Sequence, residues 1–276
     1  MFFIIYFYFC YFCGNVLCFN IYFLSCFLKD CSLVCFFPNM HHYIFDPKAV
    51  QIRDNPEIRC ISWQPCATRR ISYFGATIGR RALSNLSSES CLVIVDGIAY
   101  PTTEHAYQAR LWDPEFRWMF GVEGPLSSFE GAVSVGFNFG LKNSTAENIK
   151  AKIKFWDKRC CGAIGIVPKI LSNRKNNSYK SVNVGGIQLP PPNAEHDFGV
   201  MTEDEFWVFI LTQKFQDGDA KNLLLQNEDT LVEFDRGAGK RGSFWGGVVQ
   251  KNTVKGYNYM GGMLMIVRSL LLKKSV

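Results

Sequence analysis

The pattern of apolar and polar positions predicts a few short strands and several helices. Its clearest feature is a pair of apolar runs, 91–95 and 98–100, on either side of the dipeptide Asp96-Gly97. Such a dipeptide between two apolar runs predicts a β-hairpin, because both residues tolerate the positive φ angles of the tightest hairpin turns. A further short strand is expected at 71–74.

A helix is expected directly after this hairpin. Pro101 suits the first turn of a helix, where its missing N–H group is not needed, and Thr102 or Thr103 can cap the N-terminus of that helix. The sequence therefore predicts a helix over 104–112.

Four more helices are predicted from capping patterns and apolar spacing. The capping boxes Ser144-x-x-Glu147 and Thr202-x-x-Glu205 each precede an apolar run. The expected segments are helices near 145–157, 203–215, 219–231 and 260–273, with a Gly-rich loop at 237–256 before the last helix.

Two other stretches are expected to be irregular. Residues 38–70 carry prolines at nine-residue intervals among mixed polar residues, and we interpret them as a lead-in. Residues 173–199 are polar and include the triplet Pro190-Pro191-Pro192, and we interpret them as a surface insertion, because compact domains rarely contain so long a structureless loop. The domain itself is expected from 71 to 272.

The first 37 residues differ in composition from the rest of the chain. They hold 10 of the 24 Phe, 6 of the 11 Cys and 4 of the 11 Tyr, but only two charged residues, Lys29 and Asp30. Residues 1–28 carry no charge and are long enough to cross a membrane, which takes about 20 apolar residues. They lack the basic region and the cleavage site of a secretory signal peptide.

Three interpretations of this N-terminal tract stay open. It is a membrane anchor, a soluble extension, or thymine-rich untranslated sequence read as protein, with Met40 as the true start. The pair Cys10-x-x-Cys13 lies inside the tract, and zinc sites normally need a second pair of ligands, so no metal site is predicted.

Net charge and cysteine content indicate which ligands the protein could bind and in which cellular compartment it lies. The formal net charge of +6 fits phosphate-bearing ligands, but only weakly. Five cysteines follow residue 37, an odd number without regular spacing, which favours a reducing compartment. A glycan on the sequon at Asn85 would block a segment expected at the active site. We therefore expect a cytoplasmic protein, tethered to a membrane only if residues 1–28 are translated.

Two acidic residues are candidates for catalysis. Glu104 and His105 open a helix next to a rigid hairpin, so both could project into a cleft, with Gln108 on the same side as Glu104. The alternative is that Glu104 only complements the helix N-terminus and His105 is a core histidine. Glu233 is the second acidic candidate. Two carboxylates in one cleft could cleave a glycosidic bond, one acting on a water or sugar hydroxyl and the other stabilising oxocarbenium charge.

Trp245 is a candidate for binding a base. It lies in the Gly-rich loop, where glycines let the backbone approach a ligand closely, and its ring is suited to stacking on a nucleobase. The alternative is that it packs in the core. The loop matches neither the P-loop nor the dinucleotide fingerprint. Its Lys240 and Arg241 either meet a phosphate or form a solvated basic pair.

Several segments, in order along the chain, resemble the YbiA-like or NADAR (NAD and ADP-ribose associated) family. The resemblance covers roughly 71–150 and 200–272, and its most specific part is the Asp-Gly hairpin leading into Pro-Thr-x-Glu-His. The segments are Leu83 to Leu86, Val95 to Gly97, Tyr100 to Ala109, Phe244 to Gly246, Asn258 to Gly261 and Leu264 to Arg268. The resemblance implies an α+β fold: a compact, mostly helical single domain with a small β-hairpin or sheet.

The resemblance also implies a function. Members of the family are N-glycosidases: some hydrolyse phosphorylated pyrimidine intermediates of riboflavin synthesis, and others remove ADP-ribose from guanine. The expected function is hydrolysis of an N-glycosidic bond between ribose and a base-like group, in a small nucleotide or in ADP-ribosylated nucleic acid, without a cofactor or a stable partner. The alternative is a catalytically inactive module that binds ADP-ribose or a nucleotide.

The same resemblance implies roles for individual residues. Glu104 matches the catalytic glutamate of the family, Trp245 an aromatic wall against the base, and Glu233 an acidic position ahead of the Trp loop. The candidate catalytic residues are Glu104 and Glu233. The candidate substrate-binding residues are Asn85, His105, Gln108, Trp245 and Asn258.

This chain departs from the family pattern at four positions. The lysine that many members carry seven residues after the glutamate is Leu111 here, and the Asp three residues before the Trp is Gly242. The Arg that often follows the Asn is Tyr259, and the Arg of a Gly-Arg-Asp segment is Phe137. These departures put phosphate recognition in doubt and exclude covalent use of that lysine. The candidates for a second aromatic wall are Phe198 and Trp207.

Overall fold

The computed structural model describes the chain over 56–65, 70–75, 80–135, 147–148, 151, 154, 164–172, 182–251 and 253–274. The predictions for the first 37 residues and for Phe137 lie outside these ranges, as does most of the helix expected near 145–157. None of the helices within the described ranges is both long and apolar enough to cross a membrane.

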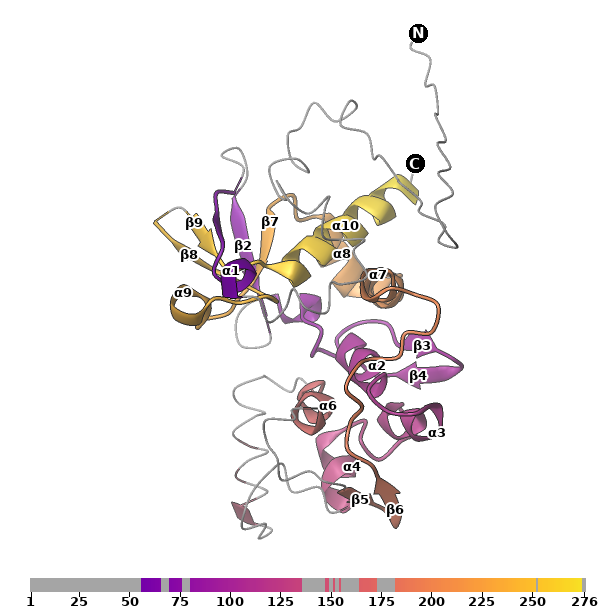
Figure 1. The fold of residues 1–276 in the computed structure, drawn as a ribbon. Helices are drawn as coiled ribbons and strands as arrows, with labels where there is room; N and C mark the ends of the chain where they lie inside the picture. The colour runs from indigo at the N-terminus through magenta and orange to yellow at the C-terminus, as the bar shows by residue number, and fades with distance from the viewer. Residues whose placement is uncertain are drawn as a thin grey trace, which may run out of the picture.

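The described residues form an α+β fold of helices and short strands (Figure 1). The strands are β1 (Ser62–Trp63), β2 (Ile71–Phe74), β3 (Val93–Val95), β4 (Ile98–Tyr100), β5 (Val182–Val184), β6 (Ile187–Leu189), β7 (Thr230–Glu233), β8 (Val248–Gln250) and β9 (Thr253–Lys255). The helices are α1 (Pro56–Arg59), α2 (Thr103–Ala109), α3 (Pro114–Arg117), α4 (Phe129–Ser134), α6 (Ile166–Leu171), α7 (Glu203–Lys214), α8 (Gly218–Leu225), α9 (Ala238–Arg241) and α10 (Tyr259–Lys274), with 3-10 turns η3 (Arg81–Leu83) and η4 (Trp118–Phe120). Strand order is β1-β9-β8 in one sheet, and the other strands pair as β2-β7, β3-β4 and β5-β6.

The long helix α10 packs against β7, α7 and α8 in the upper half of the molecule (Figure 1). β7 is parallel to β2, with Phe74 opposite Glu233 at the end of the pair. Phe74, Leu231 and Val232 are fully buried there, and burial of each such side chain stabilises the fold by about 1.5–3 kcal/mol. This pairing holds Glu233 at the end of a buried strand.

The hairpin forms as predicted, and the helix after it begins where predicted but ends at Ala109 rather than at 112. β3 and β4 pair around Asp96 and Gly97, which have φ angles of 51° and 75°. Thr102 is the N-cap of α2, and its Oγ1 accepts the His105 backbone N–H at 3.1 Å. The capping box predicted for α7 is present, and α10 matches the expected closing helix.

The structure corrects the prediction of a helix over 219–231. α8 ends at Leu225, because Asn227 Oδ1 accepts the Asp229 backbone N–H at 2.9 Å and turns the chain. The next residues then join β2 as β7. The Gly-rich loop expected at 237–256 is also more ordered than predicted, since it contains α9 and the β8-β9 hairpin.

Part of the lead-in belongs to the domain. β1 pairs with β9, and Trp63 Nε1 donates to the Gly256 carbonyl at 3.0 Å. The Ser243 backbone N–H donates to the carbonyl of Arg59, at the end of α1, at 2.8 Å. The prediction of an irregular segment before residue 71 is therefore wrong for 56–65, because these residues pair with partners far along the chain.

The predicted surface insertion contains the β5-β6 hairpin, whose Val184 and Leu189 lie in the core. Residues 190–199 then cross the C-terminal end of α2, and we call this segment the strap. The backbone N–H groups of Asn193 and Asp197 donate to carbonyls at the end of α2, at 2.7 and 2.8 Å. The strap is therefore bonded to α2 rather than extended away from the domain.

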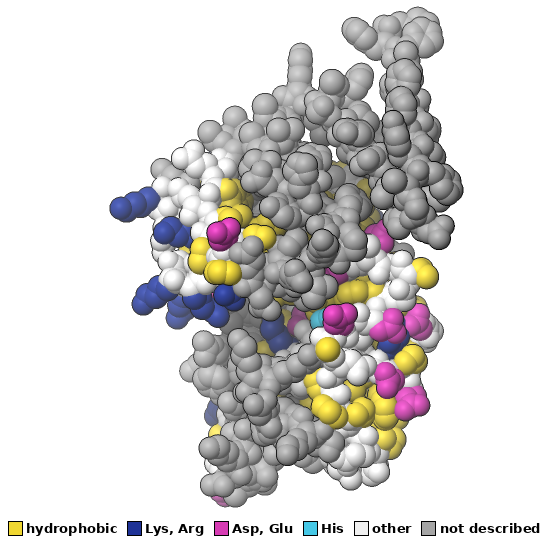
Figure 2. Space-filling model, viewed as in Figure 1, with side chains coloured by type: hydrophobic (Ala, Val, Ile, Leu, Met, Phe, Trp, Pro, Cys, Tyr) yellow, Lys and Arg dark blue, Asp and Glu magenta, His cyan; other side chains and the backbone are white. Residues whose placement is uncertain are grey.

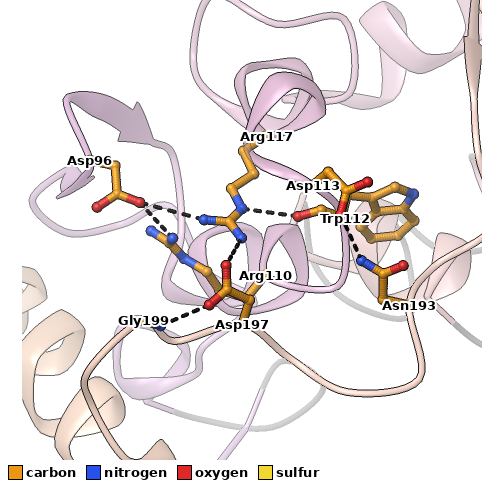
Figure 3. Close-up of polar contacts among 8 residues, drawn as sticks. All are labelled: Asp96, Arg110, Trp112, Asp113, Arg117, Asn193, Asp197 and Gly199. Carbon is orange, nitrogen blue, oxygen red and sulfur yellow. Dashed lines mark hydrogen bonds and ion pairs between the residues drawn. The ribbon is translucent and has the colours of Figure 1, made fainter.

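Two buried arginines hold the strap to the rest of the fold (Figure 3). Arg117 Nη2 lies 2.5 Å from Asp197 Oδ2, and Arg110 Nη1 lies 2.6 Å from Asp96 Oδ2. Arg117 Nη1 also lies 3.5 Å from the same Asp96 oxygen. The hydrogen bond from Arg117 lowers the pKa of Asp197 below its usual value. The cluster thus joins the strap to the turn of the β3-β4 hairpin and to α3.

Candidate active site

Glu104 lies in the first turn of α2 and is only 5% exposed. Its backbone N–H donates to the Asn85 carbonyl at 3.1 Å. Gln108 Nε2 donates to Glu104 Oε1 at 2.9 Å, so the two side chains meet as their helical spacing predicts. The carboxyl is therefore oriented from within its own helix.

A cation that the sequence analysis missed lies beside this carboxyl. Lys169 Nζ, from α6, is 3.9 Å from Glu104 Oε1, and the lysine side chain is 52% exposed. α6 packs against α2, and Gly165 lies so close to Leu86 that any side chain there would clash with its backbone. No local pattern marks Lys169, because the contact joins segments that are distant in sequence.

Glu233 is held at the end of β7 by backbone hydrogen bonds. Its N–H donates to Asn258 Oδ1 at 3.0 Å, and its carbonyl accepts the Gly247 N–H at 2.8 Å. The other end of the Asn258 amide, Nδ2, donates to the Leu231 carbonyl at 2.9 Å. Asn258 thus positions the strand that carries Glu233.

The other acidic candidate, Glu104, is among the charges that act on Glu233. Protein packed around this half-buried residue raises the pKa of its carboxyl to about 7. Lys169 opposes the rise, as does Lys214 more weakly, whereas the carboxylates of Glu104 and Asp235 add to it. The charge of Glu104 acts on Glu233 although the two residues lie on different elements. The interacting charged groups are thus Glu104 on α2, Lys169 on α6 and Glu233 on β7.

Trp245 lies next to this site with part of its surface exposed. Its ring meets those of Tyr107 and Trp207 edge-to-face, at centroid distances of 6.0 Å each, and that of Tyr259 at 5.4 Å. Tyr107 is on α2, one turn after Glu104. Gly246 follows Trp245, and any side chain on it would clash with the Glu233 carbonyl. The structure therefore brings Glu104, Glu233 and Trp245 together.

A row of aromatic rings lies against Tyr107. His196 and Phe198, from the strap, have centroids 4.2 and 5.8 Å from the Tyr107 ring, and Trp207 stacks on it at 4.5 Å. Trp207 is 1% exposed and belongs to the core, whereas Phe198 is half-buried. Of the two candidates for a second aromatic wall, Phe198 is the one with accessible surface.

The loop that carries Asn85 is fastened by a buried lysine. Lys214 Nζ donates to the Ser84 carbonyl at 2.5 Å, and burial lowers the pKa of this lysine to about 7. Asn85 Oδ1 accepts the Thr103 hydroxyl at 3.3 Å. Asn85 is thus placed at the N-terminal end of α2, beside the backbone of Glu104.

His105 follows Glu104 in α2 and is fully buried. Its Nδ1 is 2.8 Å from Thr102 Oγ1 and its Nε2 is 3.2 Å from the Leu126 carbonyl. Burial lowers the pKa of His105 to about 3, so the ring is neutral. Both ring nitrogens have protein partners, which is the arrangement expected of a core histidine, and we leave His105 out of the proposed binding set.

Three departures from the family pattern have visible structural settings. Leu111 is buried, and its carbonyl is bonded to the strap. Gly242 has a φ of 71° and lies so close to Arg59 that a side chain would clash with its carbonyl. The Tyr259 hydroxyl donates to Asp204 Oδ1. An acidic side chain at position 242 is therefore incompatible with the way α1 packs here.

No family model and no curated protein matches the chain. A solved structure, the NMR structure of the Escherichia coli protein YbiA, is similar over 77% of this chain and 90% of its own, with 18% identity and a TM-score of 0.42. Similarity at this level establishes neither family nor function, so function has to be inferred from the site residues.

The site offers carboxyl, amide, ammonium and aromatic groups. Within the described ranges, no three His, Cys, Asp or Glu side chains are grouped as they would be around a metal ion. Two carboxyls with different surroundings, beside an accessible indole, can carry out acid–base chemistry on a bond between a sugar and a planar base.

Proposed function

We propose that this protein is a hydrolase that cleaves the N-glycosidic bond between a ribose and a base-like group. The observation that carries the proposal is the convergence of Glu104, from α2, and Glu233, from β7, beside Trp245. The sequence resemblance to N-glycosidases supports the same reaction.

The two carboxyls divide the work of hydrolysis. Because its pKa is about 7, Glu233 is partly protonated at neutral pH and can donate a proton to the departing base. Glu104, beside Gln108 and Lys169, acts as the general base or stabilises the positive charge that develops on the ribose. The bond from ribose C1′ to nitrogen breaks, the water oxygen bonds to C1′, and the water proton passes to a carboxylate.

Substrate binding is assigned to the residues around this pair. Trp245 holds the base and Asn85 the sugar, with Gln108 and Phe198 at the edges of the site. The resemblance favours an ADP-ribosylated guanine or a phosphorylated pyrimidine ribotide as substrate. Asn258 acts through the backbone of Glu233 and is therefore a positioning residue in this proposal.

The test is hydrolysis by the full chain and its Glu104→Gln variant. Substrates are ADP-ribosylated guanine in DNA, a diaminopyrimidine ribotide and NAD, with chromatographic detection of the released base or sugar. We expect Glu104→Gln to lower kcat by about 10³-fold, because it removes the base or charge stabiliser, while ligand affinity is kept. Glu115→Gln, at an exposed glutamate of α3, is the matched control and should keep wild-type activity.

The alternative is a binding module for ADP-ribose or a nucleotide. It is favoured by Leu111, which cannot supply the ammonium group that many family members carry there, and by Gly242, whose close approach to Arg59 leaves no room for an acidic side chain. Tight ADP-ribose binding without hydrolysis of any substrate, in both the wild type and Glu104→Gln, would establish the binding module and reject the hydrolase.

A further inference from the structure

Exposed cations gather on the segment that joins Glu233 to Trp245 and on the hairpin beside it. Figure 2 shows Lys and Arg side chains clustered where α9 and β8-β9 lie, whereas Asp and Glu gather over the region of β3-β4 and α3. Arg236, Lys240, Arg241 and Lys251 are exposed, and Arg59 and Lys255 are half-buried. We call these six residues the cationic edge.

The cationic edge has an excess of positive charge. The acidic residues of the same elements are Asp235, which lies 3.1 Å from Arg241 Nη2, and Glu57 in α1. Six cations and two carboxylates leave a net charge of +4. A surface of this kind attracts anions and raises their local concentration.

The elements that carry these cations are packed or hydrogen-bonded to one another. α9 packs against β8, where an added Cβ at Gly239 would lie 3.4 Å from Cγ1 of Val248. β8 pairs with β9, and β9 with β1. Cations on α9, on β9 and in the turn between β8 and β9 can therefore meet more than one phosphate group.

We propose that the cationic edge binds the sugar-phosphate backbone of a single-stranded nucleic acid whose base is presented to Trp245. Proteins hold single strands by this combination, in which cations track the phosphates and an aromatic side chain stacks on a base. The segment from Glu233 to Trp245 carries both components, since Arg236 and Lys240 lie between the two site residues in the chain. An acidic protein would use the cations but leave Trp245 without a role. The inference rests on the proposed function in one respect, the place of the base at Trp245.

The test is binding of a fluorescein-labelled single-stranded oligonucleotide of about 12 nucleotides to the full chain, followed by anisotropy. Affinity is measured between about 50 and 300 mM NaCl for the wild type and for a variant with Arg236→Ser, Lys240→Ser and Lys251→Ser. The matched control removes three cations elsewhere, with Arg70→Ser, Lys154→Ser and Lys221→Ser. All six changes lie at residues with solvent-accessible side chains.

We expect the edge variant to bind about 10- to 100-fold more weakly at low salt, and its log–log salt slope to become shallower by about 2. The control variant should stay within about threefold of the wild type. The proposal is overturned if the oligonucleotide does not bind, if both variants lose affinity equally, or if polyglutamate displaces the oligonucleotide as well as unlabelled strand does.

Failure of the proposed glycosidase activity and failure of nucleic-acid binding at the cationic edge give different results. The edge variant should hydrolyse a free nucleotide at the wild-type rate, because it leaves Glu104, Glu233 and Trp245 unchanged. Loss of oligonucleotide binding with retained hydrolysis assigns the edge to docking alone. Full activity of Glu104→Gln would reject the glycosidase, whereas the oligonucleotide titration decides the cationic edge by itself.

Discussion

At the scale of single residues, the surroundings of two glutamates differ although both lie in one site. Glu104 has a hydrogen-bond donor from Gln108 and the ammonium of Lys169 beside it. Glu233 has the packing of β7 and α10 around it, which raises the pKa of its carboxyl. Burial disfavours the charged form of an acid, so Glu233 can keep its proton at neutral pH.

The pH dependence of hydrolysis tests the role of Glu233 and the influence of Lys169. Because the proposed donor must be protonated, kcat/KM should fall as the pH rises through about 7. Lys169 lowers the pKa of Glu233, so Lys169→Met should move this falling limb to higher pH, while Lys169→Arg keeps it near the wild-type position. A limb that stays in place in Lys169→Met would contradict the assignment.

His105 predicts a loss of stability in acid. Its pKa is about 3 in the folded protein and about 6.5 in the unfolded chain, so below pH 6.5 the unfolded state takes up a proton that the folded state does not. The free energy of unfolding should therefore fall by about 2 kcal/mol from this group between pH 7 and pH 5.

Urea unfolding of the wild type and of His105→Gln at several pH values measures this contribution. Glu233 acts in the opposite direction, since its raised pKa makes folding more favourable as the pH falls from about 7 to 4.5. Subtracting the curve of unfolding free energy against pH for His105→Gln from that of the wild type removes the contribution of Glu233, because both proteins contain it. Parallel curves would show that His105 is not buried in its neutral form.

At the scale of elements, close backbone contacts at glycines decide how the site is assembled. Gly246 lets the Trp245 loop lie against the Glu233 carbonyl, and Gly165 lets α6 approach Leu86 and so bring Lys169 to Glu104. Gly242 ends α9 with a positive φ against α1. The first two contacts hold Trp245 and Lys169 next to the acidic residues of the site.

Gly242→Ala should therefore destabilise the fold strongly. A side chain at φ 71° and ψ 171° costs about 1–3 kcal/mol, and the clash with the Arg59 carbonyl adds to this, for a total of about 3 kcal/mol or more. Gly186→Ala is the control, because Gly186 also has a positive φ but nothing lies within 4 Å of an added Cβ. Thermal unfolding measures both, and equal losses would contradict the close packing of α1 on α9.

At the scale of the whole molecule, segments from both ends of the described chain pair with each other. β1 pairs with β9, and β2 with β7, so the surroundings of Glu233 depend on residues 56–75. Ile58 and Trp63 also pack against the core. The cationic edge also combines residues from both ends of the described chain. Arg59 belongs to α1, and the other five cations lie between residues 236 and 255.

The boundary of the domain can be tested by truncation. A chain that begins at Ile71 lacks β1 and the packing of Ile58 and Trp63, so we expect it to unfold with about 3 kcal/mol less stability, or roughly 10 °C lower, than a chain that begins at Gln51. Differential scanning calorimetry measures the difference. Equal melting temperatures would mean that 56–65 contribute nothing to the domain.

Local patterns predicted the elements whose signals lie within a few neighbouring residues. The Asp96-Gly97 turn, the Thr102 cap and the Thr202 capping box all depend on hydrogen bonds or φ angles of adjacent residues, and all form as expected. The helix prediction failed at 226–231, because the pairing of β7 with β2 determines that conformation and no short window contains both strands.

The sequence by itself determined the candidates Glu104, Glu233 and Trp245, through their residue types, their local settings and the resemblance to N-glycosidases. Only the tertiary structure decided that they meet, that Lys169 joins them, and that the amide of Asn258 is bonded to β7. The physical reason is that hydrogen bonds between neighbours act over a few residues of chain. Burial, pKa shifts and ion pairs arise between segments that approach one another only after the chain has folded.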